Sequence, residues 1–311
     1  MIFDGLVPER VITLVAAATI FTVMFTLGLG IVVGEFRGVA RSSGLVARGL
    51  FSVLVAVPVL ATLVVRALDL PRPVQVGIVL MAISPGAPMA LRRSIGAGAH
   101  RAFAPALQIL VALLAVVSMP LSIAALAALY SGDATVAPQD VALQVFKAQL
   151  LPLGLGMLVR RLAPGPATRV EPVLGRLSGV LLIALLLLVL VDVTPALAAA
   201  SWRVVVAVVL VTLLAVGAGH LLGGPALPTR TAVAICSAAR NPGLALLVAT
   251  QNAAPQATVA TVLVYLVLSA LTLVPYIAFS RRFATHPPTV PKLPPAQEAP
   301  DLSSDSRRPR P

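Results

Sequence analysis

The chain has 311 residues, of which 59% are apolar and only 11% are charged. A soluble domain of this size carries about 25% charged residues, so an ordinary water-soluble globule is excluded. The net charge of +12 does not indicate nucleic-acid binding, because most of the basic residues lie in short segments between apolar runs.

Nine apolar runs follow one another along the chain, and each approaches or exceeds the ~20 residues that a membrane-spanning helix needs. In chain order the predicted spans are Val11–Val33, Leu45–Val65, Val74–Ile95, Ala102–Tyr130, Val141–Val159, Val173–Val191, Val204–Leu222, Thr229–Thr250 and Ala257–Phe279. Backbone groups in hydrocarbon must be satisfied within their own segment, and the runs do not alternate between polar and apolar residues. The sequence therefore predicts an all-α membrane protein rather than a barrel.

The loop charges predict how the chain is oriented. With the N-terminus outside, the predicted cytosolic loops contain Arg37, Arg41, Arg48, Arg92, Arg93, Arg101, Arg160, Arg161, Arg169, Arg176 and Arg230, whereas the outer segments contain Arg10, Arg66, Arg72 and Arg203. Basic residues are enriched in short cytosolic loops of membrane proteins. We therefore expect a multi-pass protein of the cell membrane with an outer N-terminus and a cytosolic C-terminus.

The composition changes after the last apolar run. Eight of the last 31 residues are proline, and the apolar periodicity stops. Residues 1–280 are thus predicted to form the transmembrane domain, and residues 281–311 a disordered, proline-rich cytosolic tail.

Two proline- and glycine-containing segments interrupt predicted spans near their middle. The third span carries Ser84-Pro85-Gly86-Ala87-Pro88, and the eighth carries Cys236-Ser237-Ala238-Ala239-Arg240-Asn241-Pro242-Gly243. Proline removes a backbone donor, and non-helical backbone at membrane depth persists only inside protein or beside a wet cavity. These two spans cross in opposite directions, which favours an inverted-repeat transporter with two broken helices that cross at the midplane. Two simple proline kinks are the alternative interpretation.

Arg240 is the most unusual single residue, because a guanidinium in mid-span costs at least ~3 kcal/mol. Two roles stay open for it: binding an anionic ligand, or capping the carbonyl ends of the interrupted helices. Lys147 lies about two turns inside its span, and snorkelling to the headgroups explains it. The predicted substrate-binding residues are Ser84, Pro85, Gly86, Pro88, Gln108, Ser237, Arg240, Asn241, Pro242 and Gly243.

Enzyme, metal and cofactor functions find no support in the sequence. The chain has a single cysteine, Cys236, and no HExxH, GxSxG or P-loop motif. No predicted span carries a carboxylate near its centre, so a conventional acidic proton relay or acidic sodium site is not expected.

Four segments together resemble the bile acid:sodium symporter family. They are FTVMFTLGLGIV from residue 21, ISPGAPMA from residue 83, FKAQLLPLGLGMLVRR from residue 146 and ARNPGLAL from residue 239. The resemblance covers roughly residues 11–280. It implies a core domain and a panel domain, two helix crossovers and alternating access.

The sequence departs from the family at the positions that hold sodium. The resemblance places the family's polar and acidic ligands on Val53, Ala90, Leu91, Ala104, Gln108, Cys236 and Arg240, and only Asn241 keeps the family residue. We therefore expect weak or absent sodium coupling, with Arg240 standing where a bound cation would lie.

The expected function is a multi-pass secondary transporter or facilitator of a small organic anion, with the lipid bilayer as its surroundings and no nucleic-acid partner. The alternative is a non-transporting membrane sensor or binding protein on the same fold.

Overall fold

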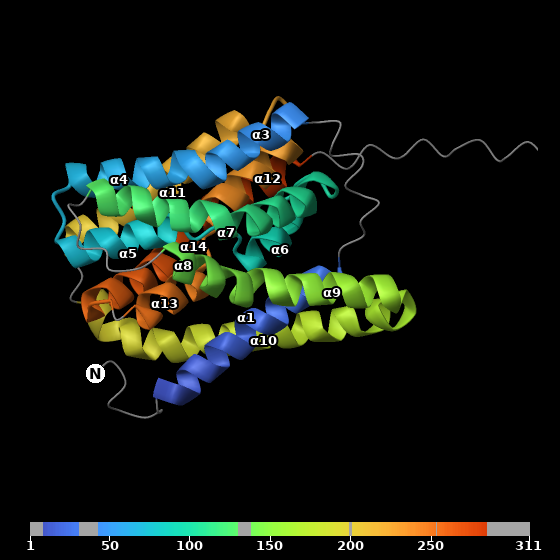
Figure 1. Ribbon diagram of the computed structural model, residues 1–311. Helices are drawn as coiled ribbons and strands as arrows, with labels where there is room; N and C mark the ends of the chain where they lie inside the picture. The colour runs from blue at the N-terminus through green and yellow to red at the C-terminus, as the bar shows by residue number, and fades with distance from the viewer. Residues whose placement is uncertain (1–8, 31–42, 130–137, 199–200, 253, 285–311) are drawn as a thin grey trace, which may run out of the picture.

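The computed structural model describes residues 9–30, 43–129, 138–198, 201–252 and 254–284, and every regular element within them is helical (Figure 1). The elements are α1 (Glu9–Leu29), α3 (Ser43–Phe51), η2 (Ser52–Ala56), α4 (Val57–Ala67), α5 (Arg72–Ala82), α6 (Pro88–Gly96), α7 (Phe103–Leu129), α8 (Pro138–Val145), η3 (Phe146–Leu150), α9 (Leu151–Leu162), α10 (Pro164–Ala198), α11 (Trp202–Leu222), α12 (Leu227–Ala238), α13 (Pro242–Gln251) and α14 (Gln256–Phe283). The elements η2 and η3 are short π-helical turns inside longer helices.

As far as the described residues reach, each predicted apolar run overlaps one of these helices or consecutive ones. Within the described residues, six helical segments are long and apolar enough to cross a membrane: Ser43–Ala67, Phe103–Leu126, Gln139–Leu162, Trp202–Leu222, Leu227–Gln251 and Gln256–Phe283. Ala17–Leu29 and Arg72–Ala82 are shorter apolar helices. The all-helical, multi-pass architecture is confirmed, whereas the count of nine spans and the inverted repeat stay predictions.

Large apolar side chains are exposed along several of these helices. Leu63, Val117, Leu121, Leu213 and Leu271 each expose more than half of their surface. A water-soluble monomer rarely presents so much apolar surface, but hydrocarbon solvates it at no cost. This surface is the expected lipid-facing side of the bundle.

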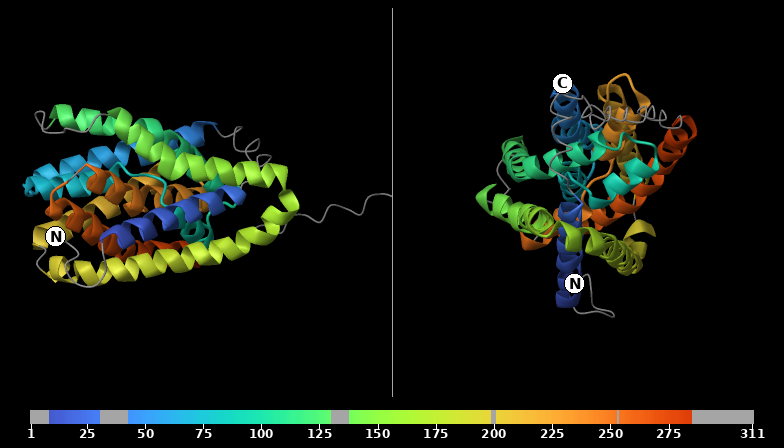
Figure 2. Two further views of the ribbon diagram at one scale, coloured as in Figure 1. Left: turned by 60° about the horizontal axis from the view of Figure 1, so that its bottom comes forward. Right: turned by 90° about the vertical axis from the view of Figure 1, so that its right-hand side faces the viewer.

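Helix α1 lies between α9 and α10, which together form a long hairpin (Figure 2). Two glycines permit the close approach of α1 and α9. A Cβ atom on Gly28 would collide with the backbone oxygen of Leu153, and one on Gly156 would collide with that of Phe25. We call α1, α8–η3–α9 and α10 the outer group.

The other helices, α3–η2–α4, α7, α11 and α14, surround the two broken helices, α5–α6 and α12–α13. We call the surrounding helices and the two broken ones together the central group. Helix α12 packs against α11, α6 and α7, and α14 packs along α5 and α11. At the end of α14, Arg281 donates from Nε to the carbonyl oxygen of Gly96 over 2.8 Å. Helix α14 continues through Phe283, three residues past the predicted end of the transmembrane domain at residue 280. Residues 285–311 lie outside the described residues, so the disordered tail stays a prediction.

Candidate functional site

The first interrupted helix breaks at the predicted Ser84–Pro88 segment. Helix α5 ends at Ala82, residues 84–87 are not helical, and α6 begins at Pro88. Gly86 has φ of 82°, the left-handed region that glycine adopts without strain. Proline at the first position of a helix costs no hydrogen bond, so Pro88 starts α6 while Pro85 cannot extend α5.

The second interrupted helix breaks where the sequence also predicts. Helix α12 ends at Ala238, and α13 begins at Pro242. Asn241 caps α13, because its Oδ1 accepts from the backbone N–H of Leu244 over 3.1 Å. Gly243 lets α13 approach α1, since a Cβ there would lie 2.7 Å from Cδ1 of Ile20.

The two breaks touch each other directly. The backbone N–H of Asn241 donates to the carbonyl oxygen of Ser84 over 2.9 Å. Gln108 from α7 donates from Nε2 to the Ala87 oxygen over 3.0 Å, and its Oε1 lies 3.5 Å from Sγ of Cys236. The interruption of both helices is thus confirmed, and main-chain groups freed by the breaks bond to one another and to Gln108.

A π-helical turn beside the second break exposes a carbonyl group toward it. In η2 the Val57 N–H donates to the Ser52 oxygen, five residues back. In an α-helix the carbonyl oxygen of Val53 would accept from the N–H of Val57, which here bonds to Ser52. In a π-helix it would accept from residue 58, which is proline and has no N–H. The neighbouring hydroxyl groups of Ser52 and Ser237 form a hydrogen bond of 2.8 Å.

Arg240 supplies the missing donor, over 3.0 Å from Nη1 to the Val53 oxygen. Its side chain is only 4% exposed. The structure therefore gives Arg240 a capping contact, but on a carbonyl of η2 rather than on the carbonyl ends of the broken helices.

Part of the Arg240 side chain stays without an acceptor. Its Nε and Nη2, and Nδ2 of Asn241, find no hydrogen-bond partner among the described residues. Buried charged groups normally pair their hydrogens, because leaving a donor unsatisfied costs about 1–3 kcal/mol or more. These donors lie where the two breaks meet, and we call this place the crossing. Helices α6 and α13 begin there, and helix N-termini attract anions.

The four uncharged polar residues predicted for the site are packed inside the protein. Ser84 donates from Oγ to the Leu80 oxygen over 2.6 Å, and Ser84, Gln108, Ser237 and Asn241 are all buried. The side-chain oxygens of Gln108 and Asn241 each accept a hydrogen bond, from Sγ of Cys236 and from the Leu244 N–H. Among the described residues no cluster of three or more His, Cys, Asp or Glu could hold a metal.

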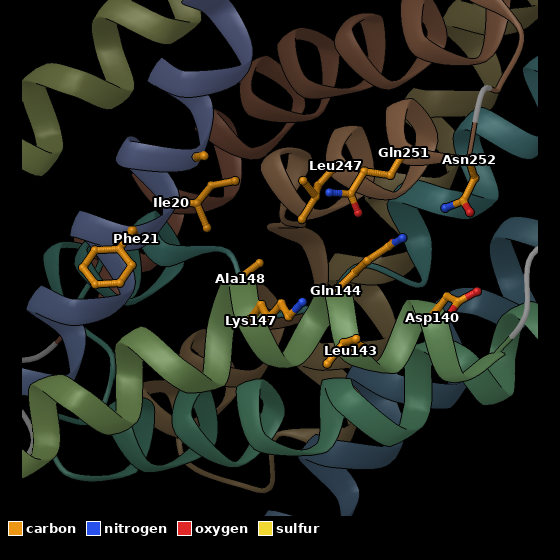
Figure 3. Close-up of a pocket in the computed structure, with 11 residues that line it drawn as sticks. Ile20, Phe21, Asp140, Leu143, Gln144, Lys147, Ala148, Leu247, Gln251 and Asn252 are labelled. Carbon is orange, nitrogen blue, oxygen red and sulfur yellow. The ribbon is translucent and has the colours of Figure 1, made fainter. Parts of the chain in front are cut away.

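A cavity of about 540 Å³ opens between α1, the α8–η3 helix and α13 (Figure 3). It is lined by Ala17, Ile20, Phe21, Asp140, Leu143, Gln144, Lys147, Ala148, Leu247, Gln251 and Asn252. Snorkelling is the sequence prediction for Lys147, and the sequence carries no prediction for the other polar residues of this wall. Asp140, Gln144 and Lys147 follow one another at spacings of four and three, which places them on one helical face. That spacing is the signal that could have revealed the cavity wall.

Gln149 is a second residue that sequence reasoning missed. Its side chain is fully buried, and neither of its polar atoms finds a partner among the described residues. A Cβ on Gly86 would lie 3.7 Å from its Oε1, so this carboxamide faces the first break.

The chain matches a known protein family. Residues 17–200 match the family model described as "Sodium Bile acid symporter family", a match that includes the first break and the cavity walls on α1 and α8–η3. No curated protein matches the chain. Since the matched segment covers more than half of the sequence, the chain belongs to the sodium bile acid symporter family.

Proposed function

We propose that this protein is a secondary transporter or facilitator of a small organic anion. Family membership supports transport, and the crossing supports the charge of the substrate. The observation that carries the proposal is the buried Arg240 guanidinium at the junction of the two breaks, with Nε and Nη2 unpaired. In this proposal the central group is the core and the outer group is the panel, and rocking between them exposes the crossing to each side in turn.

The proposal places the protein in the cell membrane with an outer N-terminus and a cytosolic C-terminus. Support comes from the distribution of arginines between alternate loops, which follows the positive-inside rule. In this orientation the part of the cavity lined by Asp140 and Asn252 lies toward the outer side, since each residue is at the end of its helix that the proposal places outside.

Arg240 takes the place of a coupling cation in this mechanism. It follows the C-terminus of α12 by two residues, where the helix dipole favours positive charge, and it bonds to the Val53 oxygen. The resemblance places three of the family's sodium-ligand positions on Val53, Cys236 and Arg240, and Cys236 lies one helical turn before Arg240. A fixed guanidinium repels a second cation, so transport is expected not to depend on sodium.

Uptake into proteoliposomes tests this proposal. Purified protein is first screened by thermal shift against anionic metabolites, because a ligand that binds only the folded state raises the melting temperature. Uptake of the ligand with the largest shift is then measured with sodium and with potassium outside the vesicles. We expect initial rates that agree within about twofold, since Arg240 replaces the ion. A steep rise with external sodium contradicts the role of Arg240, and binding without uptake indicates a sensor instead.

A further inference from the structure

The three helices of the outer group are joined to one another by direct contacts. The hydroxyl groups of Thr26 on α1 and Ser178 on α10 share a hydrogen bond of 3.2 Å. Gly28 and Gly156 bring the backbones of α1 and α9 together. Closely packed helices shift as a body rather than deform, so these contacts favour movement of the outer group as one unit.

A notch on α10 receives a side chain from the central group. Gly175 and Gly179 lie four residues apart, so both open onto one face of α10. A Cβ on Gly175 would collide with Nη2 of Arg92, and one on Gly179 would lie 3.7 Å from Nη1 of the same residue. Arg92 belongs to α6, the second half of the first broken helix. Its guanidinium therefore bridges the central and outer groups.

This bridge and the cavity lie at different levels of the junction between the two groups. Phe21 of α1 lines the cavity, whereas Thr26, five residues later, borders the notch, since its Cγ2 would lie 3.7 Å from a Cβ on Gly175. Five residues correspond to about 7.5 Å along a helix. In the proposed orientation the notch is the more cytosolic of the two. A cavity thus separates the groups toward the outer side, and Arg92 connects them toward the inner side.

Arg92 fits the notch because residue 175 has no side chain. The colliding atom, Nη2, is the far end of a flexible side chain, so an alanine at residue 175 displaces the arginine rather than the helices. The same alanine would meet Thr26 at 3.7 Å, an ordinary van der Waals distance. Gly175→Ala is therefore expected to empty the notch of Arg92 and to preserve the packing of α1 on α10.

We propose that Arg92, seated in the notch of Gly175 and Gly179, is an inner gate that keeps the cytosolic ends of the central and outer groups together. Withdrawal of this side chain lets the two ends part. The inference rests on the proposed function, because it assumes that the two groups move against each other.

The distance between two spin labels tests the gate. Gly44→Cys places one label on α3 of the central group, and Gly165→Cys places the other at the start of α10. Both glycines are exposed, and a Cβ on either would meet no atom within 4 Å. Double electron–electron resonance measures the distance distribution in lipid nanodiscs. The native Cys236 is buried, and labelling of protein without the two new cysteines measures its contribution.

Gly175→Ala and Arg92→Ala are each expected to raise the fraction of molecules with a longer distance about threefold or more, since the closed state alone loses a contact. Gly154→Ala is the matched control, because it makes the same change in the outer group where a Cβ meets no atom within 4 Å. It is expected to leave the distribution unchanged. Gly175→Ala is expected to add nothing to Arg92→Ala, because the alanine acts through that side chain.

An unchanged distribution for either Gly175→Ala or Arg92→Ala overturns the inference. So does an effect of Gly175→Ala that is equally large with and without Arg92. The proposed function fails in a different measurement. A gate-dependent distance in a protein that moves no anion into vesicles supports the gate and contradicts transport, whereas anion uptake by a protein whose label distance ignores both substitutions contradicts the gate alone.

Discussion

The two π-helical turns share one local construction but lie in different surroundings. In η2 the N–H of Val57 donates to Ser52, and in η3 the N–H of Leu151 donates to Phe146. Proline follows one residue later in both helices, at positions 58 and 152. In each turn, therefore, the carbonyl group of the second residue lacks its usual backbone donors.

Different cations lie at the second residue of each turn. In η2 that residue is Val53, whose carbonyl oxygen accepts from Arg240 of another helix, inside the central group. In η3 that residue is Lys147, whose own side chain lines the cavity. The comparison indicates that one construction is associated with a buried cation that bonds to the free carbonyl in the first case, and with an exposed cation in the second. The following predictions test that contrast, from the largest expected effect to the smallest.

Arg240→Gln removes the buried positive charge. We expect uptake of the ligand found in the thermal-shift screen to fall at least about tenfold, because charge-assisted hydrogen bonds contribute about 1.5–3 kcal/mol. The protein is still expected to reach the membrane. Uptake is measured in proteoliposomes that contain equal amounts of protein, with Arg101→Gln, an exposed arginine of a predicted cytosolic loop, as the control. Wild-type uptake by Arg240→Gln would assign this residue to structure alone.

Pro58→Ala tests whether Arg240 compensates for a missing backbone donor. Alanine restores an N–H to η2, so the Val53 oxygen no longer depends on the guanidinium. We expect the loss of unfolding free energy caused by Arg240→Gln to be smaller by about 1 kcal/mol when Pro58→Ala is present. The free energies come from unfolding in mixed detergent micelles. Pro152→Ala makes the same change in η3 and is expected to show no coupling with Arg240; equal coupling in both turns would refute the assignment.

Asp140→Asn tests the surroundings of the cation in η3, since Asp140 and Lys147 line the same cavity. Removing one negative charge about 10 Å along the helix from Lys147 is expected to improve the binding of an anionic fluorescent probe, dansylglycine, about twofold. Binding of the neutral probe dansylamide is expected to change less. Titrations in nanodiscs at low ionic strength measure both affinities, because salt screens this interaction. An identical change for the two probes would argue against an electrostatic effect of Asp140.

The breaks could be predicted from the sequence because proline and glycine act locally. Pro85, Gly86 and Pro242 end or start a helix whatever surrounds them, and a lone arginine in an apolar run is conspicuous in any span. The nine apolar runs could be recognised for the same reason, because the hydropathy of a segment does not depend on which other segments pack against it.

The contacts of the site could not be predicted, because they depend on how distant segments meet. Arg240 and the carbonyl of Val53 are 187 residues apart. The cavity joins residues 17–21, 140–148 and 247–252, and no local pattern relates these three segments. The depth of Lys147, about two turns inside its span, predicts snorkelling to the headgroups, and that depth carries no information on the end of α13, which lines the same cavity.

The hydrogen bond between Asn241 and Ser84 joins the two breaks through main-chain atoms alone. Replacing either side chain leaves that N–H and that carbonyl in place, so alanine scanning will underrate the point at which the two helices are tied. Exchanging the amide of residue 241 for an ester by chemical ligation removes the donor and nothing else. The direct bond between the two breaks is thus made by the polypeptide backbone, and it does not require a particular side chain at residue 84 or residue 241.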